Sequence, residues 1–185
     1  MKSDIPDEIL IEEIASGDTS AFKTIIERYQ SLVLNIAFRF IGNPHDAEDI
    51  AQEAFLRLFQ NANYYKPTAK FKTWFWRIVT NLCLDFLKKK KPVYVNEFFD
   101  IASDNPMSRE NMELSERQRV IHKTIQSLIS TQRMAVLLHY YEGLRYKEIA
   151  QVMGCSVKAV ESLLVRAKQT LRKSLHTILQ ENFLR

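Results

Sequence analysis

Apolar residues recur three and four positions apart along most of this chain, which is the spacing of one face of an α-helix. The longest run predicts a helix within residues 19–43, and the sequence Gly42-Asn43-Pro44 should end it. Its apolar positions are Phe22, Ile25, Ile26, Tyr29, Val33, Ile36, Ala37 and Phe40. A shorter helix is predicted before it, between Pro6 and Gly17. Because no segment of useful length alternates apolar and polar residues, we expect an all-α fold.

The segment HDAEDIAQEAFLRLFQNA, residues 45–62, predicts a helix with two different faces. Its inward positions are Ala47, Ile50, Ala51, Ala54, Phe55, Leu58 and Phe59. Its outward positions are Asp46, Asp49, Gln52, Glu53 and Arg57. The outer face is mainly acidic, so it should stay away from anionic partners.

The next predicted helix, FKTWFWRIVTNLCLDFLKKKK, follows a loop that contains Pro67 and ends before Pro92. One face should be core: Phe71, Phe75, Ile78, Leu82 and Phe86, flanked by Val79. The opposite side holds Trp76, Arg77, Thr80, Asn81 and Lys88, with Trp74 at the border. Aromatic rings beside cations suit unpaired bases, which stack on rings. Alternatively, both tryptophans are buried and the lysines only solvate a helix C-terminus, where positive charge is favourable.

Residues 93 to about 107 lack a helical stripe and contain Asn96, Asp100, Asp104 and Pro106, so residues 93–111 are predicted to form a flexible linker. The chain would then comprise two small helical domains, residues 1–92 and 112–185. Helices should resume near Ser108.

The segment YKEIAQVMGCSVKAVESLL in the second domain has the layout of a helix-turn-helix. Ala150 is small where the two helices must touch, Gly154 can adopt the left-handed turn conformation, and Ser156 can cap the second helix. The expected shared core is Ile149, Met153, Val157, Val160, Leu163 and Leu164. The preceding helix should start with Ser130 or Thr131 as its N-cap and stop at Gly143. The second helix would present Lys158, Ser162 and Arg166 to a DNA major groove, although Glu161 opposes phosphates; the alternative is a helical hairpin that never touches DNA.

Charge is unevenly distributed along the 185 residues, although the net charge is only +4. Residues 1–65 carry a net −6, residues 66–91 carry +7 and residues 92–115 carry −4, while the remainder is positive. Two basic blocks separated by acidic ones indicate two anion-binding surfaces.

Several classes of protein are disfavoured by the composition. Cys83 and Cys155 make neither a disulfide framework nor a metal set, and the four histidines lack metal-ligand spacing. The N-terminus does not resemble a signal peptide, and no window is apolar enough for a membrane span. We expect a reduced, soluble, cytoplasmic protein without cofactor or membrane insertion.

In order and spacing, the motifs NPHDAEDIAQEAFLRLF, FKTWFWRIVTNLCLDFLKKKK and STQRMAVLLHYYEGLRYKEIAQVMGCSVKAVESLLVRAKQTL resemble those of extracytoplasmic-function (ECF) sigma factors of bacterial RNA polymerase. The resemblance covers about residues 5–92 and 112–178. It implies a two-domain, non-enzymatic promoter-specificity subunit whose partners are core RNA polymerase, through the β′ clamp helices and the β flap, promoter DNA and an anti-sigma factor. The linker would thread toward the polymerase active-site and RNA-exit channels.

The resemblance also implies three sets of site residues. The residues expected to dock on the clamp helices are Asp46, Asp49, Gln52, Glu53, Leu56 and Arg57. Those expected to recognise and melt the −10 element are Asn63, Lys70, Lys72, Trp74, Arg77 and Asn81, and Lys88, Lys89 and the lysines after them are expected near upstream phosphates. Those expected to recognise the −35 element are Lys147, Ser156, Lys158, Ala159, Ser162 and Arg166.

Two departures from the family pattern stand out: no proline pair precedes Gln132-Arg133, and Glu161 and Leu163 occupy positions that are usually basic. The main alternative function is a stand-alone helix-turn-helix regulator of duplex DNA, with residues 1–92 as a dimerising or ligand-sensing bundle. The aromatic-basic helix argues against it, because a duplex binder does not need one. An enzyme is a poor third, since no nucleophile lies in a recognisable motif.

Overall fold

Helices account for most of the residues that the computed structural model describes, which are 5–67, 70–89 and 116–183, and none of these residues forms a strand. The predicted all-α fold is confirmed. The N-terminal half contains α1 (Asp7–Ala15), α2 (Thr19–Ile41), α3 (Pro44–Asn61), the short 3₁₀ helix η2 (Ala62–Tyr64) and α4 (Phe71–Lys89). The C-terminal half contains α6 (Glu116–Gln126), α7 (Ser130–Tyr140), α8 (Tyr146–Met153) and α9 (Val157–Phe183). The predicted linker, the helix start near Ser108, and Lys90 and Lys91 lie outside the described residues.

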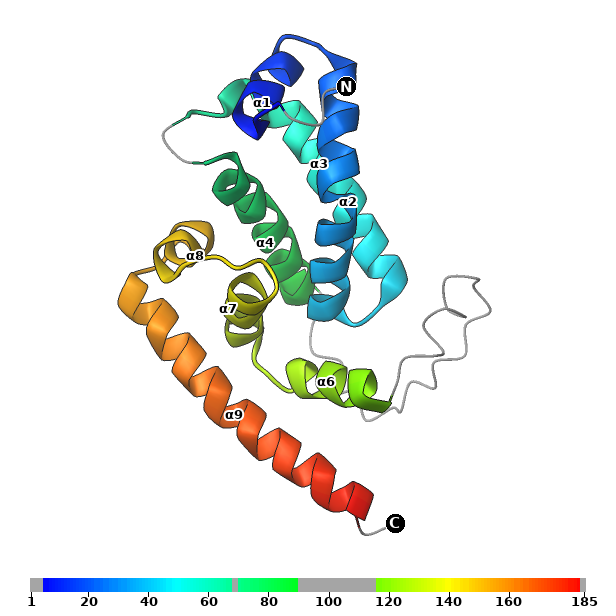
Figure 1. Cartoon of the computed structure of the whole chain (residues 1–185), viewed down its shortest axis with the longest axis vertical. Coiled ribbons are helices and arrows are strands. Elements are labelled where there is room, and N and C mark those ends of the chain that lie inside the picture. Colours follow the sequence, from blue (N-terminus) through cyan, green and yellow to red (C-terminus); the bar gives the residue numbers. More distant parts are fainter. Residues whose placement is uncertain (1–4, 68–69, 90–115, 184–185) are drawn as a thin grey trace.

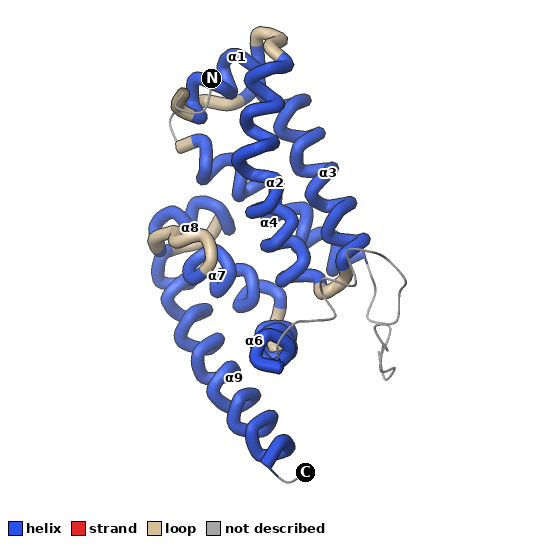
Figure 2. Tube along the Cα trace, turned by 45° about the vertical axis from the view of Figure 1, so that its right-hand side comes forward, coloured by secondary structure: helices blue, strands red, loops and turns tan. Residues whose placement is uncertain are grey.

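In the N-terminal half, α2 and α3 run side by side, and α4 packs against them (Figures 1 and 2). The Asp18 carboxylate caps α2 by accepting a hydrogen bond from the Ser20 backbone N–H at 2.7 Å. Gly42 ends α2 with φ +87°, a left-handed conformation that favours glycine. The Asn43 side chain then starts α3 by accepting from the Asp46 N–H at 3.1 Å. The predicted end of the long helix at Gly42-Asn43-Pro44 is therefore built from local caps.

An aromatic cluster joins α2 to α4. The Tyr29 ring makes edge contacts with Phe71 and Phe75, at centroid distances of 5.5 and 5.6 Å. Phe59, which was expected to point inward, is 41% exposed, so that prediction was wrong. Its ring lies on the outer edge of the α2–α3 contact, 5.0 Å from the ring of Phe22.

The start of α7 differs from the prediction. Ile129 occupies the N-cap position with extended backbone, and its carbonyl accepts from the Arg133 N–H at 2.9 Å. Ser130 is consequently the first helical residue rather than the cap. The helix ends at Tyr140, and Gly143 lies beyond it in the loop with φ +67°.

The helix-turn-helix forms as its spacing predicted. Gly154 is left-handed with φ +64°, and the next N–H, of Cys155, donates to the Ala150 carbonyl at 3.0 Å. The Ser156 hydroxyl caps α9 by accepting from the Ala159 N–H at 3.1 Å. Val157, expected in the shared core, is 40% exposed because it begins α9 on the solvent side; the buried apolar side chain missed from this core is Val152.

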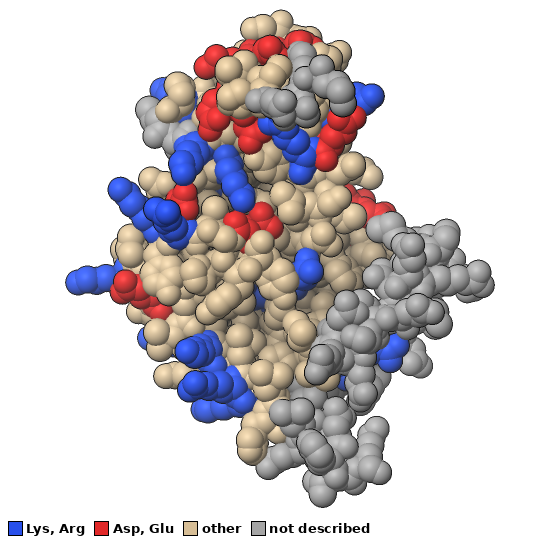
Figure 3. All heavy atoms as spheres, in the orientation of Figure 1, with Lys and Arg blue, Asp and Glu red and all other residues tan. Residues whose placement is uncertain are grey.

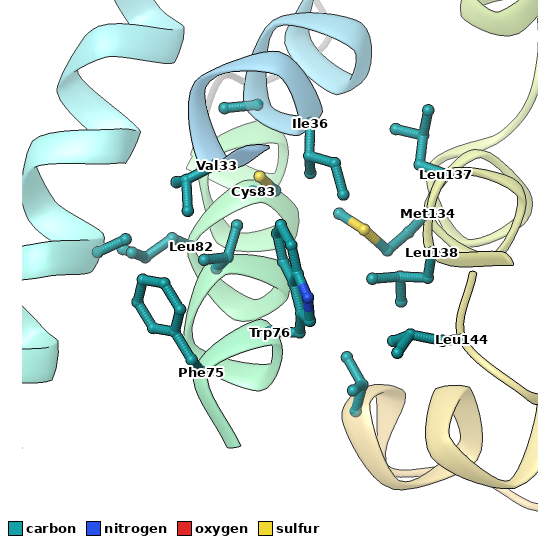
Figure 4. Close-up of a cluster of buried hydrophobic side chains, with 14 of the residues drawn as sticks. Val33, Ile36, Phe75, Trp76, Leu82, Cys83, Met134, Leu137, Leu138 and Leu144 are labelled. Carbon is teal, nitrogen blue, oxygen red and sulfur yellow. The ribbon is translucent and has the colours of Figure 1, made fainter. Parts of the chain in front are cut away.

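The two halves pack against each other, and α4 lies between them (Figure 1). Trp76 and Thr80 were both assigned to the exposed side of α4, but Trp76 is fully buried and Thr80 is 1% exposed, so both assignments were wrong. Figure 4 shows the Trp76 indole directed toward Met134, Leu138 and Leu144 of the C-terminal half. The N-terminal helices cover one face of α4, whereas α7, α8 and the loop between them cover another. We call this contact between the halves the seam.

Hydrogen bonds also cross the seam, at the end of α2. The Arg133 guanidinium donates to the Phe40 carbonyl, and the Gln126 side-chain amide donates to the Arg39 carbonyl at 2.8 Å. These donors satisfy carbonyls at the C-terminal end of α2 that have no partner within their own helix.

Candidate nucleic-acid interface

Three of the residues predicted for the −10 element lie together in a pocket on the N-terminal half. Trp74, Arg77 and Asn81 project from successive turns of α4 and line a hollow of about 340 Å³. The Trp74 indole is half-buried, with its ring held at 5.4 Å from the Tyr65 ring in an edge contact. Arg77 and Asn81 are exposed. The pocket therefore combines a fixed aromatic surface with a cation and an amide.

The opposite wall of the pocket was missed by the sequence analysis. It is formed by Arg57 and Asn61 at the end of α3 and by Tyr64 of η2, with Ile78 from α4. Asn61 donates to the Arg57 carbonyl at 2.8 Å, and the Arg57 Nε donates to Glu53 at 2.7 Å. Tyr64 is 76% exposed, and the available signal in the sequence was an aromatic residue in the segment predicted to be the loop before α4.

The chemistry of this pocket suits one flat heteroaromatic group. Indole and phenol rings can stack on a base, and the amide of Asn81 can both donate to and accept from the edge of a base. Two guanidinium groups, of Arg57 and Arg77, line the same hollow and favour an anion nearby. A volume of this size lies at the lower end of the range for small-ligand sites, which begins at about 300 Å³.

The remaining residues predicted for the −10 element lie elsewhere. Lys70 and Lys72 lie at the seam, where the Lys70 Nζ is 3.5 Å from a carboxylate oxygen of Glu148. The Lys72 Nζ donates to the Glu142 carbonyl at 3.2 Å and lies 3.8 Å from the carboxylate of the same residue. Lys88 and Lys89 are exposed in the last turn of α4, and Asn63 is exposed beside Tyr64. The predicted set is therefore divided among the pocket, the seam and the end of α4.

The outer face of α3 stays uncovered by the described residues. Asp49, Gln52 and Leu56 are exposed, with Leu56 at 49%, while Asp46 and Glu53 are half-buried. Exposed Leu56 provides apolar contact area beside the carboxylates. This surface has the composition of a protein-binding face rather than of a DNA-binding one.

The outer face of the helix-turn-helix is basic. Lys147, Lys158, Ser162 and Arg166 are exposed, Ala159 is half-buried, and the exposed Ser156 uses its hydroxyl as the cap of α9. Figure 3 shows lysine and arginine side chains along the edge formed by α8 and α9, and acidic side chains around α1 at the other end. Glu161 is also exposed on α9, so the face is not uniformly positive.

An apolar groove of about 320 Å³ lies in the C-terminal half between α6, α7 and α9. Its walls include Ile121, Val136, Tyr140, Leu171 and Leu175. Ile121 and Tyr140 are 49% and 69% exposed, so part of this apolar wall faces solvent. Sequence analysis did not predict it, because its walls come from three separate helices.

The part of the chain that the structure describes contains neither a candidate metal site nor a candidate membrane-spanning helix. No group of three or more histidine, cysteine or acidic residues gathers there as a metal site would require. Burial raises the pKa of the Cys83 thiol to about 12. No helix within these ranges is long and apolar enough to cross a bilayer.

Comparison with known proteins gives consistent matches along both halves. The family model for Sigma-70 region 2 matches residues 25–93, and that for Sigma-70 region 4 matches residues 118–171. The ECF RNA polymerase sigma factor SigW of Bacillus subtilis is 31% identical over 91% of this chain and 96% of its own length. The RNA polymerase sigma-H factor of Pseudomonas aeruginosa is 32% identical over 95% and 96%, respectively. Among solved structures, CnrH in complex with the cytosolic domain of CnrY has a TM-score of 0.72 at 24% identity, covering 92% of this chain and 97% of that one.

Proposed function

The chain belongs to the extracytoplasmic-function sigma factors, the subunits that direct RNA polymerase to particular promoters, and we propose how its surfaces divide that work. It is an alternative sigma factor that acts in transcription initiation with core RNA polymerase and promoter DNA. We infer that it works in the cytoplasm, where RNA polymerase transcribes, and that it acts by binding rather than by catalysis. The alternative of a stand-alone duplex-binding regulator is set aside, because the matches include Sigma-70 region 2 as well as the helix-turn-helix region.

The pocket lined by Trp74, Arg77 and Asn81 is proposed to hold one unstacked base of the −10 element. The observation that carries this proposal is the convergence of rings, amide and guanidinium groups from α3, η2 and α4 on a single hollow. Removing a base from the duplex costs a few kcal/mol, and stacking on an aromatic side chain returns about 1–3 kcal/mol per base. Capture in the pocket would thus favour strand separation without ATP. Lys88 and Lys89 would bind phosphates upstream of the separated strand.

The other surfaces would hold the chain on polymerase and on the upstream element. The α3 face, with Asp49, Gln52 and Leu56 at its centre, would dock on the β′ clamp helices. The helix-turn-helix would enter the major groove of the −35 element through Lys158, Ser162 and Arg166. The apolar groove would receive the β flap, which the family resemblance expects in this half. An anti-sigma factor is a further expected partner, and the similar chain CnrH was solved in complex with the cytosolic domain of CnrY.

The test of the pocket compares Trp74→Ala and Asn81→Ala with the unmodified chain. Each variant is assembled with core polymerase, and promoter melting is followed by permanganate reactivity of unpaired thymines. We expect loss of melting with nearly unchanged polymerase affinity, since these side chains belong to α4, whereas the proposed docking face is centred on Asp49, Gln52 and Leu56 of α3. Gln60→Ala, an exposed change at the end of α3 that does not line the pocket, is the control. An equal loss of melting and of polymerase binding would assign both residues a structural role instead.

A further inference from the structure

The first backbone N–H of α4 is bound by a side chain from the other end of the N-terminal half. The Glu8 carboxylate of α1 accepts from the Phe71 N–H at 3.1 Å. Lys70 holds the N-cap position of α4, since its carbonyl accepts from the Thr73 and Trp74 N–H groups at 3.0 and 3.2 Å. A lysine side chain has no acceptor and cannot satisfy the free N–H groups of a first helical turn. Glu8 therefore supplies the capping acceptor that Lys70 lacks.

Helix α1 is itself fastened to α2 by the residue next to Glu8. The Asp7 carboxylate accepts from the Arg28 guanidinium and from the Tyr29 hydroxyl, each at 2.5 Å. The Tyr29 ring also makes the edge contact with Phe71 described above. Two adjacent carboxylates of α1 thus bind α2 and α4 at the point where these two helices meet. Glu8 is consequently presented to α4 from a fixed backbone.

The residue whose N–H is capped supports the aromatic ring of the proposed base pocket. Phe71 is fully buried, and its ring centroid lies 6.1 Å from that of Trp74 and 6.3 Å from that of Tyr65. Tyr65 in turn makes the 5.4 Å edge contact that holds the Trp74 indole. Burial raises the pKa of Tyr65, and the Glu8 and Glu12 carboxylates raise it further, so both lie near its phenol. A shift of Phe71 would therefore be passed to the indole directly and through Tyr65.

Helix α1 touches the elements that form both walls of the pocket. It packs against η2, which carries Tyr64 of one wall, and against α4, which carries Trp74 of the other. The match to Sigma-70 region 2 begins at residue 25, so α1 precedes the matched residues. The contacts of α1 thus indicate a role that the family match does not assign.

We propose that Glu8 is a positioning residue for recognition of the −10 element. By binding the first N–H of α4 it fixes Phe71, and through Phe71 and Tyr65 it holds the Trp74 indole in the orientation that receives an unstacked base. A ring that is already oriented loses less freedom on binding, which favours affinity. Glu8 itself need not touch DNA. The inference rests on the proposed base pocket and adds to it a residue from outside that pocket.

Four variants separate the acceptor of Glu8 from its charge. Glu8→Gln keeps an oxygen that can accept from Phe71, whereas Glu8→Met keeps the length but deletes the acceptor. Glu8→Asp keeps the charge but withdraws the acceptor by one methylene, and it repeats the test in a milder form. Glu12→Met removes the same charge from an exposed position of α1 and is the control.

Each variant is assembled with core polymerase, at a temperature where circular dichroism shows the chain to be folded. Anisotropy then measures the affinity for a fluorescein-labelled single strand, the −10 oligonucleotide, from a promoter that this polymerase transcribes. Loss of a whole stacking ring lowers affinity about 5- to 150-fold, so a displaced ring in Glu8→Met should lower it about three- to tenfold. Glu8→Asp should also bind more weakly, while Glu8→Gln and Glu12→Met should match the unmodified chain. Equal affinity of all the folded variants, or an equal loss in Glu8→Gln and Glu8→Met, would overturn the proposal.

Oligonucleotides that each lack one base distinguish this inference from the proposed function. At the position whose base enters the pocket, removal of that base should abolish the difference between Trp74→Ala and the unmodified chain. The same oligonucleotide should abolish the effect of Glu8→Met, because the orientation of the indole has no consequence without a base. An effect of Glu8→Met that persists on this oligonucleotide overturns the inference alone. If no missing base abolishes the effect of Trp74→Ala, the proposed base pocket itself is overturned.

Discussion

Removal of Arg133 should weaken both the seam and the C-terminal half. It is 9% exposed, and its guanidinium donates to the Phe40 carbonyl across the seam and to the Gln126 and Leu128 carbonyls within its own half. Substitution with methionine keeps most of the volume and the unbranched stem but deletes every donor. The Phe40, Gln126 and Leu128 carbonyls then lose this donor.

The expected loss follows from two opposing quantities. A hydrogen bond to a charged group contributes about 1.5–3 kcal/mol, so three such bonds are worth roughly 5–9 kcal/mol. Burial of the guanidinium costs several kcal/mol, a cost that methionine removes. We expect the Arg133→Met chain to lose about 2–4 kcal/mol of unfolding free energy. The unpartnered Arg133 Nε favours the lower end of this range.

Urea unfolding followed by circular dichroism at 222 nm measures this loss. Arg39→Met is the matched control, because it removes the same group from the same seam. Half-buried Arg39 makes a cation–π contact with Tyr141, worth about 0.5–1 kcal/mol at exposed sites and about 2 kcal/mol when desolvated, and attracts the Glu142 carboxylate, so its removal should cost less than removal of Arg133. If the two variants unfolded at the same urea concentration, or if Arg133→Met were more stable than the unmodified chain, the hydrogen-bond account of Arg133 would be refuted.

Three further predictions concern other parts of the molecule. Burial and the nearby Arg133 lower the pKa of His122 below its usual value of 6.5, so the unfolded chain binds this proton more readily and the unfolding free energy should fall as pH drops below 6.5. If His122→Phe lost as much unfolding free energy over the same pH range in urea unfolding, His122 would not be the cause of the fall. Ser156→Ala should cost about 1 kcal/mol through loss of the α9 cap, whereas the exposed Ser162→Ala should cost under about 0.5 kcal/mol; equal thermal melting points would count against the cap. Asp49→Arg should weaken core polymerase binding about tenfold, equivalent to ~1.4 kcal/mol, while −10 oligonucleotide binding is unchanged; unaltered affinity in a competition assay would remove Asp49 from the docking face.

The helices and the helix-turn-helix could be predicted because their causes are local. Apolar spacing, the glycine at the turn and the serine cap act within a few residues of one another, as Gly154 and Ser156 illustrate. The error at α7 has a local cause too, since Ile129 has the extended backbone of an N-cap without supplying a side-chain acceptor. Nothing in the sequence favours a helix start with Ile129 as the N-cap over one with Ser130 as the N-cap.

The seam and the pocket depend on contacts between distant segments, and here the sequence analysis was incomplete. Trp76, Val79 and Cys83 follow one another by three and four positions, so α4 carries a second apolar stripe. That stripe was visible but was not recognised as a second buried face. Arg57, which was predicted to serve docking, also lines the pocket, because the end of α3 reaches α4 only after the chain has folded.

The two tryptophans, Trp74 and Trp76, are the only ones in the chain, and they lie on different sides of α4. Excitation at the red edge of protein absorbance therefore excites these two indoles selectively. The fluorescence of Trp74 at the pocket should be quenched when a nucleobase stacks on it, whereas the emission of Trp76 at the seam should shift to longer wavelength when water reaches it. With the Trp74→Phe and Trp76→Phe chains as references, one stopped-flow trace could order in time the parting of the halves and the arrival of the DNA strand, without any attached label.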